Sequence, residues 1–149
     1  MDLNRPGFGY RFAKLHRLLL YLSKNSIRSL GILPSQMSFL AILLGNDAPI
    51  TQEALSNKLV IDKAATARVL EQLEKKGFVF RITNPHNRRE KLVSATQKAH
   101  RMADKLFTAL QSASDVFVSD FNEEERAMIL DMMDRMIINA TEGKYDPNH

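Results

Sequence analysis

The chain has 149 residues, enough for one domain, or for one compact domain with an added oligomerisation element. It contains no cysteine, which excludes disulfides, thiolate metal sites and thiol redox sensing. The net charge is +4, and it is unevenly spread: residues 1–50 carry six basic and two acidic side chains, residues 51–91 nine and five, and residues 92–149 six and ten. This split fits a protein with one face toward a polyanion, although a chance scatter of charge explains it too.

Membrane insertion and secretion are not expected. The longest apolar stretches, such as Leu18–Leu22 and Phe39–Leu44, are too short to cross a bilayer. The chain does not open with a charged and then apolar leader that ends in a cleavage site. We therefore expect a cytoplasmic protein without a membrane partner.

Two helices are expected in the N-terminal part. Apolar residues from Phe8 to about Leu30 recur at helical spacing, and Gly31 is placed to end this helix. A second helix, Ser35 to about Leu44, is almost entirely apolar and is therefore expected to be buried at the centre of the fold. The segment 45–49 is a loop by composition.

A pair of short, capped helices is expected next. Thr51 can cap the first of them, and the chain breaks at residues 60–61. Asp62 can cap the second, which runs to about Lys76 and is ended by Gly77. Two short helices joined by a few residues are typical of a helix-turn-helix.

The pattern then changes to that of a β-hairpin. Val79–Ile82 and Lys91–Ser94 are rich in β-branched and aromatic residues, and the segment Thr83–Glu90 between them is turn-forming and basic. Two long amphipathic helices follow, from about Thr96 to Val118 and from a cap at Asn122 to about residue 139. The sequence therefore predicts a mainly α fold with a small antiparallel β-hairpin.

The helix after Asp62 is the first candidate for a DNA contact. On a helical wheel it turns Thr66, Val69, Leu70 and Leu73 toward the core and leaves a small and cationic face outward. Small side chains allow close approach to a major groove, where arginine can recognise guanine and glutamine can pair with adenine. A solvated helix face explains the pattern equally well. The candidate contacts on this helix are Lys63, Ala64, Ala67, Arg68, Gln72 and Lys75.

The hairpin favours DNA over that alternative. Arg81, Arg88, Arg89 and Lys91 outnumber the single acidic residue Glu90 within eleven residues. Exposed charges contribute little to stability, about 0–1 kcal/mol per pair, whereas arginine at a protruding tip can enter a minor groove. A generic basic loop is the simpler alternative. Arg81, Arg88 and Arg89 complete the set of candidate DNA contacts.

Three runs carry a resemblance to a known family: Pro49–Leu55, Leu70–Val79 with its Leu-Glu-Lys-Lys-Gly helix end, and Arg81–Arg89. With the flanking helices, they resemble the MarR (multiple antibiotic resistance regulator) family over nearly the whole chain. The resemblance implies a winged helix-turn-helix with long N- and C-terminal dimerisation helices. Residues 35–95 would form the DNA-binding domain, and residues 1–34 and 96–149 the dimerisation region.

The resemblance also implies a function. It implies a homodimeric, sequence-specific transcription regulator that binds double-stranded DNA at a pseudo-palindromic operator, more often as a repressor than as an activator. The family's wing arginine would be Arg88 or Arg89. A small phenolic or lipophilic effector would bind between the two regions, although packing explains the apolar residues there equally well. The candidate ligand-binding residues are Tyr10, Arg11, His16, Met37, Leu40 and Phe107.

Physical reasoning supports the dimer separately. The long terminal helices present more apolar surface than so small a winged module can cover, and pairing across a two-fold axis would bury it. The methionines between Met128 and Met136 suit an adaptable interface, and ordinary core filling is at least as good an explanation for them.

Two positions depart from the family pattern. Asn87 stands where the family usually has an aspartate that pairs with and orients a wing arginine, so the wing is expected to be held more loosely. The segment Ala95–Ala99 replaces the usual Leu-Thr-x-x-Gly, which leaves Thr96 able to cap the following helix.

We expect no enzyme, no cofactor and no metal site. The four histidines, His16, His86, His100 and His149, lie far apart in the sequence, and no Gly-rich phosphate loop is present. The run Glu123–Glu125 fits favourable charge at a helix start better than catalysis. Two alternatives to a ligand-responsive regulator are a winged-helix protein-interaction module and a ligand-independent architectural DNA binder.

Overall fold

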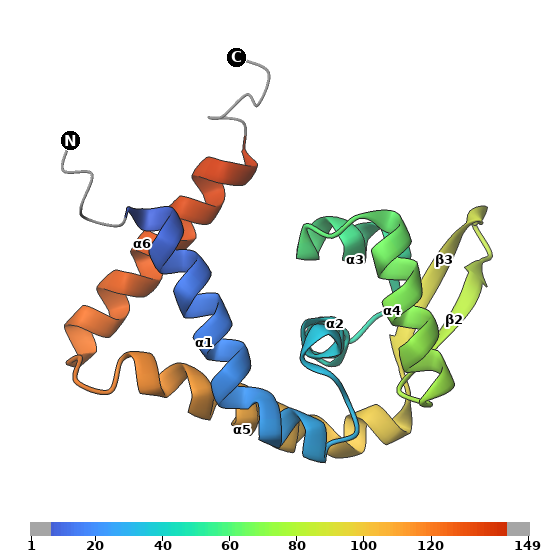
Figure 1. The fold of residues 1–149 in the computed structure, drawn as a ribbon. Coiled ribbons are helices and arrows are strands. Elements are labelled where there is room, and N and C mark those ends of the chain that lie inside the picture. Colours follow the sequence, from blue (N-terminus) through green and yellow to red (C-terminus); the bar gives the residue numbers. More distant parts are fainter. Residues whose placement is uncertain (1–6, 143–149) are drawn as a thin grey trace. The chain divides into compact units, whose positions relative to one another are not determined.

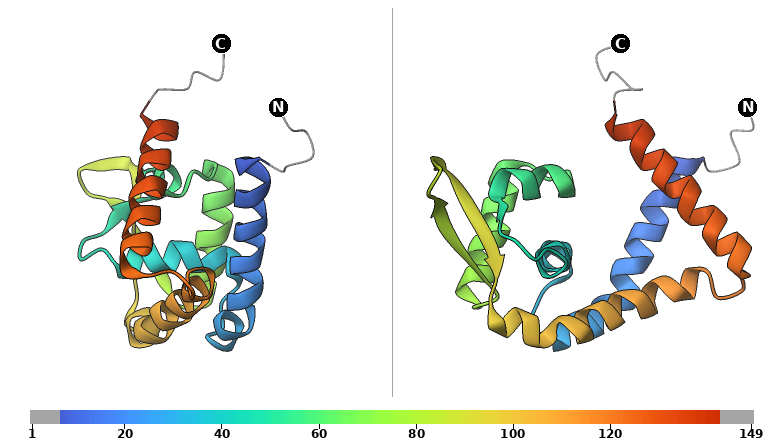
Figure 2. Two further views of the ribbon diagram at one scale, coloured as in Figure 1. Left: turned by 90° about the vertical axis from the view of Figure 1, so that its left-hand side faces the viewer. Right: turned by 180° about the vertical axis from the view of Figure 1, so that it is seen from behind.

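The computed structural model describes residues 7–142, so that residues 1–6 and 143–149, including His149, lie outside the described part. Its described residues form two compact units that divide after Ala113. The elements, shown in Figures 1 and 2, are α1 (Phe8–Ser29), α2 (Pro34–Leu44), β1 (Ile50–Thr51), α3 (Gln52–Leu59), α4 (Lys63–Lys75), β2 (Val79–Asn84), β3 (Asn87–Ala95), α5 (Gln97–Phe117) and α6 (Glu123–Thr141). The expected mainly α fold is confirmed.

Capping side chains determine where several helices begin. Oγ1 of Thr51 accepts the N–H of Ala54 at 3.1 Å, and Oδ1 of Asp62 accepts the N–H of Ala65 at 2.8 Å. Asn122 caps α6 in the same way. Each of these bonds satisfies an N–H that the first turn of a helix leaves without a partner. The helices α3, α4 and α6 therefore begin where the sequence predicts.

The strands form a three-stranded antiparallel sheet in the order β1-β3-β2, which is larger than the expected hairpin. The segment expected as a loop, Thr83–Glu90, is mostly strand, because β2 continues to Asn84 and β3 begins at Asn87. The third strand, β1, was not predicted. It has only two residues, which is too short for an alternating pattern, and it forms by pairing Ile50 with Val93.

The core of the first unit is built around α2, which packs against α1, α3, α4 and β3. Phe39 and Leu40 of α2 are fully buried, as the apolar sequence of this helix predicts. Thr66, Leu70 and Leu73 of α4 are fully buried as well, so the predicted inward face of α4 is confirmed. Their burial turns the opposite side of α4 toward solvent. The other core residues include Ile27, Ile32, Leu55, Val79, Val93, Ala99 and Leu106.

The end of α4 is linked to the start of α5. Oγ1 of Thr96 accepts the N–H of Ala99 at 3.3 Å, which confirms it as a cap, and donates to the carbonyl oxygen of Gly77 at 2.6 Å. Gly77 has a φ of +76°, which glycine adopts without a steric cost. Nζ of Lys98 donates to the carbonyl oxygen of Lys76 at 2.6 Å. Thr96, the cap of α5, and Lys98 in its first turn thus satisfy the backbone carbonyls of the two residues that follow α4.

In residues 7–142, no single helix is both long and apolar enough to cross a membrane. The helices α1 and α2 reach the required length and apolarity only when taken together, and they are bent by 75° to one another.

The turn between α3 and α4 holds a strained residue. Val60 has a φ of +54°, a left-handed conformation that brings Cβ close to the following carbonyl oxygen and costs about 1–2 kcal/mol. Its side chain is 83% exposed, so packing offsets little of this cost.

We expect Val60→Asn to raise the free energy of unfolding by about 1 kcal/mol, because asparagine tolerates the left-handed conformation better than a β-branched residue. Urea denaturation at constant protein concentration measures the change. Val60→Ala is the matched control: it removes the exposed methyl groups and keeps the Cβ, so its gain should be smaller. Equal stability of the Asn and Ala variants would contradict the assignment of strain.

Candidate nucleic-acid interface

The predicted DNA contacts come from two adjacent elements of the first unit. Figure 1 shows α4 beside the β2–β3 hairpin, which extends past it as a wing. The small and cationic face of α4 is open: Ala64, Arg68 and Lys75 are exposed and Ala67 is half-buried. The structure therefore brings this helix face and the basic hairpin to neighbouring positions.

Two lysines of α4 form ion pairs that leave them accessible. Nζ of Lys63 lies 2.9 Å from Glu53, and Nζ of Lys75 lies 3.0 Å from Glu71 one turn earlier on the same helix. All four side chains are more than half exposed. Such pairs contribute about 0–1 kcal/mol, so a phosphate can replace the carboxylate at little cost.

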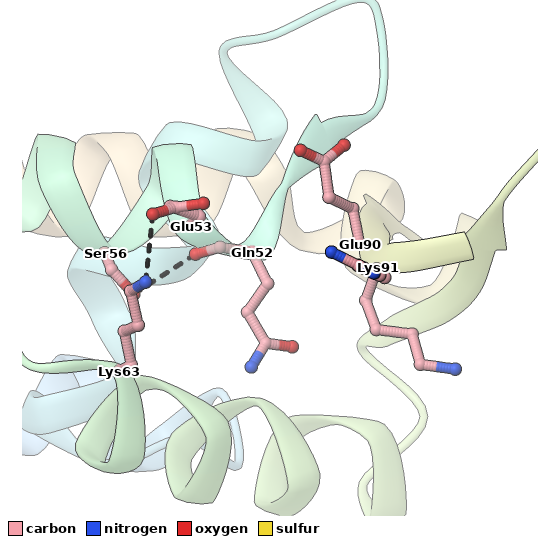
Figure 3. Close-up of a pocket in the computed structure, with 7 residues that line it drawn as sticks. Gln52, Glu53, Ser56, Lys63, Glu90 and Lys91 are labelled. Carbon is pink, nitrogen blue, oxygen red and sulfur yellow. Dashed lines mark hydrogen bonds and ion pairs between the residues drawn. The ribbon is translucent and has the colours of Figure 1, made fainter. Parts of the chain in front are cut away.

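A cleft lies where α3, the start of α4 and the wing meet (Figure 3). Lys63, Arg89 and Lys91 line it together with Glu53 and Glu90. Two uncharged residues of α3, Gln52 and Ser56, complete the lining. Basic groups from the helix-turn-helix and from the wing therefore border the same hollow, in which they alternate with two carboxylates.

The wing tip is held by its own hydrogen bonds. Oδ1 of Asn87 accepts the N–H of Arg89 at 3.2 Å, and Oδ1 of Asn84 accepts the N–H of His86 at 3.0 Å. Nδ2 of Asn84 also donates to Glu90 at 2.9 Å. Asn87 thus shapes the backbone of the tip through its amide oxygen. Arg88 and Arg89 are exposed there.

Arg81 occupies a different position from the other basic residues. Its Nη2 lies 2.8 Å from Oε2 of Glu74, to which Nε also donates at 3.3 Å. Its Nη1 donates to Oε1 of Gln52 at 3.5 Å. Only 23% of the Arg81 side chain is exposed. The guanidinium therefore joins β2 to α4 and α3, and Arg81 is a positioning residue for the wing, while its predicted contact with DNA stays a prediction.

One polar residue connected to this interface was missed by the sequence analysis. Gln36 of α2 is fully buried, and its Nε2 donates to Oε1 of Gln72 on the exposed side of α4. The two residues are far apart in the sequence, and nothing in the local pattern around Gln36 distinguishes it from an ordinary residue of a first helical turn. Only the packing of α2 against α4 identifies it.

The six candidate ligand-binding residues are not brought into one described cleft. Met37 and Leu40 belong to the hydrophobic core, whereas Tyr10, His16 and Phe107 are exposed, as is Arg11. Neither the cleft described above nor a second one, lined in α6 and the preceding loop by residues between Asp120 and Met132, contains any of the six. Their role in ligand binding stays a prediction.

Comparison with known proteins gives a consistent result. Residues 32–91 match the model of the MarR family. YdgJ of Bacillus subtilis, an uncharacterized HTH-type transcriptional regulator, is 32% identical over 106 residues, which are 71% of this chain and 64% of YdgJ. The crystal structure of a MarR transcriptional regulator from Methanosarcina mazei superimposes with a TM-score of 0.85 at 29% identity, covering 90% of this chain and 96% of that one.

Residues 32–91 form a MarR-family domain. The family resemblance seen in the sequence, and the winged helix-turn-helix fold that it implied, are thereby confirmed. The matched region spans less than two thirds of YdgJ, at 64% of its length. A MarR-family regulator from Listeria monocytogenes, crystallised with a 26mer DNA, has the same fold, with a TM-score of 0.85 at 23% identity over 93% of this chain and 91% of that one.

The ion pair between Arg81 and Glu74 gives the protein a predictable response to acid. The hydrogen bond from Arg81 lowers the pKa of Glu74 below its ordinary value of 4.5. Because the carboxylate is the stabilised form, the pair contributes fully above the ordinary pKa, and its contribution is lost as pH falls through the lowered pKa.

We expect Glu74→Gln to lower the free energy of unfolding at about pH 7 by at most about 1 kcal/mol, since both side chains retain contact with solvent. The difference from the unmodified protein should shrink toward zero as the pH falls below the lowered pKa of Glu74. Urea denaturation across this pH range measures it. Glu71→Gln, which breaks a more exposed pair, is the control and should show a smaller effect. An equal loss for Glu74→Gln at both ends of the range would exclude a role for the charge.

Proposed function

We propose that this chain is a homodimeric, sequence-specific transcription regulator that binds a pseudo-palindromic DNA operator in the cytoplasm. In this proposal α4 lies in a major groove and the wing reaches the adjacent minor groove. One observation carries it: the buried side of α4 turns Ala64, Arg68 and Lys75 outward beside a hairpin whose tip exposes Arg88 and Arg89.

In this proposal, the two regions expected from the sequence have different functions. Residues 35–95 bind DNA, with Lys63, Ala64, Ala67, Arg68, Gln72 and Lys75 on the helix and Arg81, Arg88 and Arg89 on the wing. Residues 1–34 and 96–149 form the dimer. The Listeria regulator crystallised with DNA and a MepR–DNA complex from Staphylococcus aureus lend support through their shared fold, at 23% and 17% identity.

Exposed apolar side chains support the dimer. On α1, Phe8 and Tyr21 are 70% and 73% exposed, and on α6, Leu130 and Ile137 are 63% and 58% exposed. No residue of α6 is buried within the described chain. Apolar surface on this scale marks an interaction site in a protein that stays in solution, and a second copy of the chain can cover it. Two-fold pairing would also set two recognition helices about 34 Å apart, one turn of DNA.

We further propose that the protein is a repressor released by a small phenolic or lipophilic ligand. The family supports this, and one structural relative, CouR from Rhodococcus jostii, was crystallised with p-coumaroyl-CoA. CouR is 15% identical to this chain, so it supports the fold and not the identity of the ligand. Tyr10, Arg11, His16, Met37, Leu40 and Phe107 are the candidates for lining the ligand site.

Two other functions are separable from this one by gel-shift assays. A winged-helix protein-interaction module would use its basic face on an acidic partner and would not prefer its own upstream DNA over random DNA at physiological salt. An architectural DNA binder would show weak sequence preference and no release by phenolic acids. The outward cationic face of α4 beside an arginine-tipped wing favours the regulator, because it offers both base-reading and phosphate-binding groups.

We expect Arg68→Ala and Arg88→Ala each to weaken operator binding by about fivefold or more, and the wing variant also to lower the slope of log affinity against log salt by about one unit. Fluorescence anisotropy at several salt concentrations measures both effects. Arg101→Ala, which removes an exposed arginine of α5, is the matched control and should retain affinity. Full affinity in both test variants would remove the proposed interface.

We expect the double variant Met133→Glu and Ile137→Glu to dissociate the dimer, because it places two charges one helical turn apart on an apolar stretch of α6 that the partner would bury. Sedimentation velocity measures the oligomeric state. Operator affinity should fall with dimer loss. Asp134→Ala and Arg135→Ala, which alter polar residues between the two sites, are the controls. A double variant that stays dimeric would show that α6 lies outside the interface.

A further inference from the structure

We infer that Gln52, the first residue of α3, donates a hydrogen bond to a backbone phosphate of the operator in the cleft between α3 and the wing. This contact rests on the proposed function, because it assumes that α4 and the wing bind DNA. It adds to that function a phosphate-binding residue that the sequence analysis did not identify, and it makes Arg81 the residue that positions Gln52.

The amide of Gln52 is oriented by the guanidinium of Arg81. Nη1 of Arg81 donates to Oε1 of Gln52 at 3.5 Å, and a guanidinium carries a positive charge and has no acceptor. The amide therefore turns its oxygen toward Arg81, which leaves Nε2, a donor only, for another partner. Arg81 is itself held by Glu74, whose Oε2 lies 2.8 Å from Nη2. The ion pair that joins the wing to α4 thus also sets the direction of the Gln52 amide.

Gln52 extends into the cleft between cations from two different elements. Figure 3 shows its side chain between Lys63, at the start of α4, and Lys91 on the wing. Arg89 of the wing also lines the cleft. An amide N–H and three cationic groups together suit an anion that only accepts hydrogen bonds, as a DNA phosphate does.

The position of Gln52 in the helix-turn-helix agrees with this chemistry. When the second helix of such a motif lies in the major groove, the first helix crosses the sugar-phosphate backbone. In this chain the first helix is α3, and Gln52 is half-buried at its start, on the side of the wing. A backbone phosphate between the grooves that α4 and the wing enter would therefore lie near Gln52.

One of the two carboxylates in the cleft competes with the phosphate. Oε1 of Glu53 lies 2.9 Å from Nζ of Lys63, and the Glu53 side chain is 55% exposed, so it can turn into solvent when a phosphate replaces it. Glu90 is held instead by Nδ2 of Asn84, at 2.9 Å within the wing. Glu53 is therefore the internal competitor for Lys63, and its removal should favour DNA binding.

The affinity of Gln52→Ala for DNA tests the contact. It should fall by about fivefold or more for operator and random DNA alike, because every sequence has the phosphate. The slope of log affinity against log salt should stay unchanged, since Gln52 is neutral, whereas Lys63→Gln should lower it by about one unit. Gln97→Ala, which changes an exposed glutamine at the first position of α5, is the matched control and should retain affinity.

Glu53→Gln tests the competition in the opposite direction. It should tighten DNA binding by about threefold, because Lys63 no longer has to leave a carboxylate. Asp47→Asn, which removes the same charge from the exposed loop before β1, is the control and should have a smaller effect. Circular dichroism and sedimentation verify that each variant is folded and has the oligomeric state of the unmodified protein. Equal gains in the two variants would overturn the role of Glu53.

Methylphosphonate substitution along the operator locates the phosphate, because it removes the charge and one acceptor oxygen at a single position. One position in each half-site should weaken binding of the unmodified protein and should cost Gln52→Ala clearly less. Arg81→Ala should also reduce the cost at this position, since it removes the group that orients Gln52. A merely structural role of Gln52 would lower affinity without this coupling. Gln97→Ala should keep the profile of the unmodified protein.

The possible outcomes separate this contact from the function beneath it. If the unmodified protein selects no operator, the proposed function is wrong and the contact fails with it. If it selects an operator but folded Gln52→Ala keeps full affinity, or changes the base preference at one position, the contact alone is overturned. A methylphosphonate profile with no position coupled to Gln52 would overturn it as well.

Discussion

The burial of one face of α4 is the constraint on which the rest of this structure depends. Thr66, Leu70 and Leu73 are fully buried, and they lie on one side of the helix. A helix packed in this way cannot rotate about its axis without exposing apolar surface, at a cost of about 25 cal/mol for each Å². The same packing that stabilises the domain therefore sets the direction in which Arg68 and Ala64 point.

The ion pairs around the candidate interface differ in how many groups they join. The half-buried Arg81 donates two hydrogen bonds to one carboxylate oxygen of the exposed Glu74, and this contact joins the wing to α4. Lys63 and Lys75 have exposed carboxylate partners that are easily exchanged. Arg81 thus helps to position the wing relative to α4, whereas Lys63 and Lys75 remain available to a polyanion.

Local chemistry was enough to predict much of this arrangement. Thr51 and Asp62 satisfy the N–H groups of the turns that follow them, so the starts of α3 and α4 could be read directly from the sequence. The inward face of α4 followed from helical periodicity. The fold family followed from the residues around the end of α4 and the wing.

What could not be predicted depends on contacts between distant parts of the chain. The strand β1 exists because β3 lies beside it, and its two residues carry no pattern of their own. Arg81 looks like one more basic wing residue until the fold places Glu74 and Gln52 around it. The interaction of Gln36 with Gln72 joins two helices separated by 36 positions in the sequence. Such pairings arise from tertiary packing, and the propensities of neighbouring residues in the sequence do not predict them.

The hydrogen bonds between the end of α4 and the start of α5 have a mechanical consequence. The carbonyl oxygens of Gly77 and Lys76 are both held at 2.6 Å, by Thr96 and Lys98 respectively. Tilting the first turn of α5 away from α4 would therefore break both bonds. A displacement of the start of α5 is thus passed on to the end of α4.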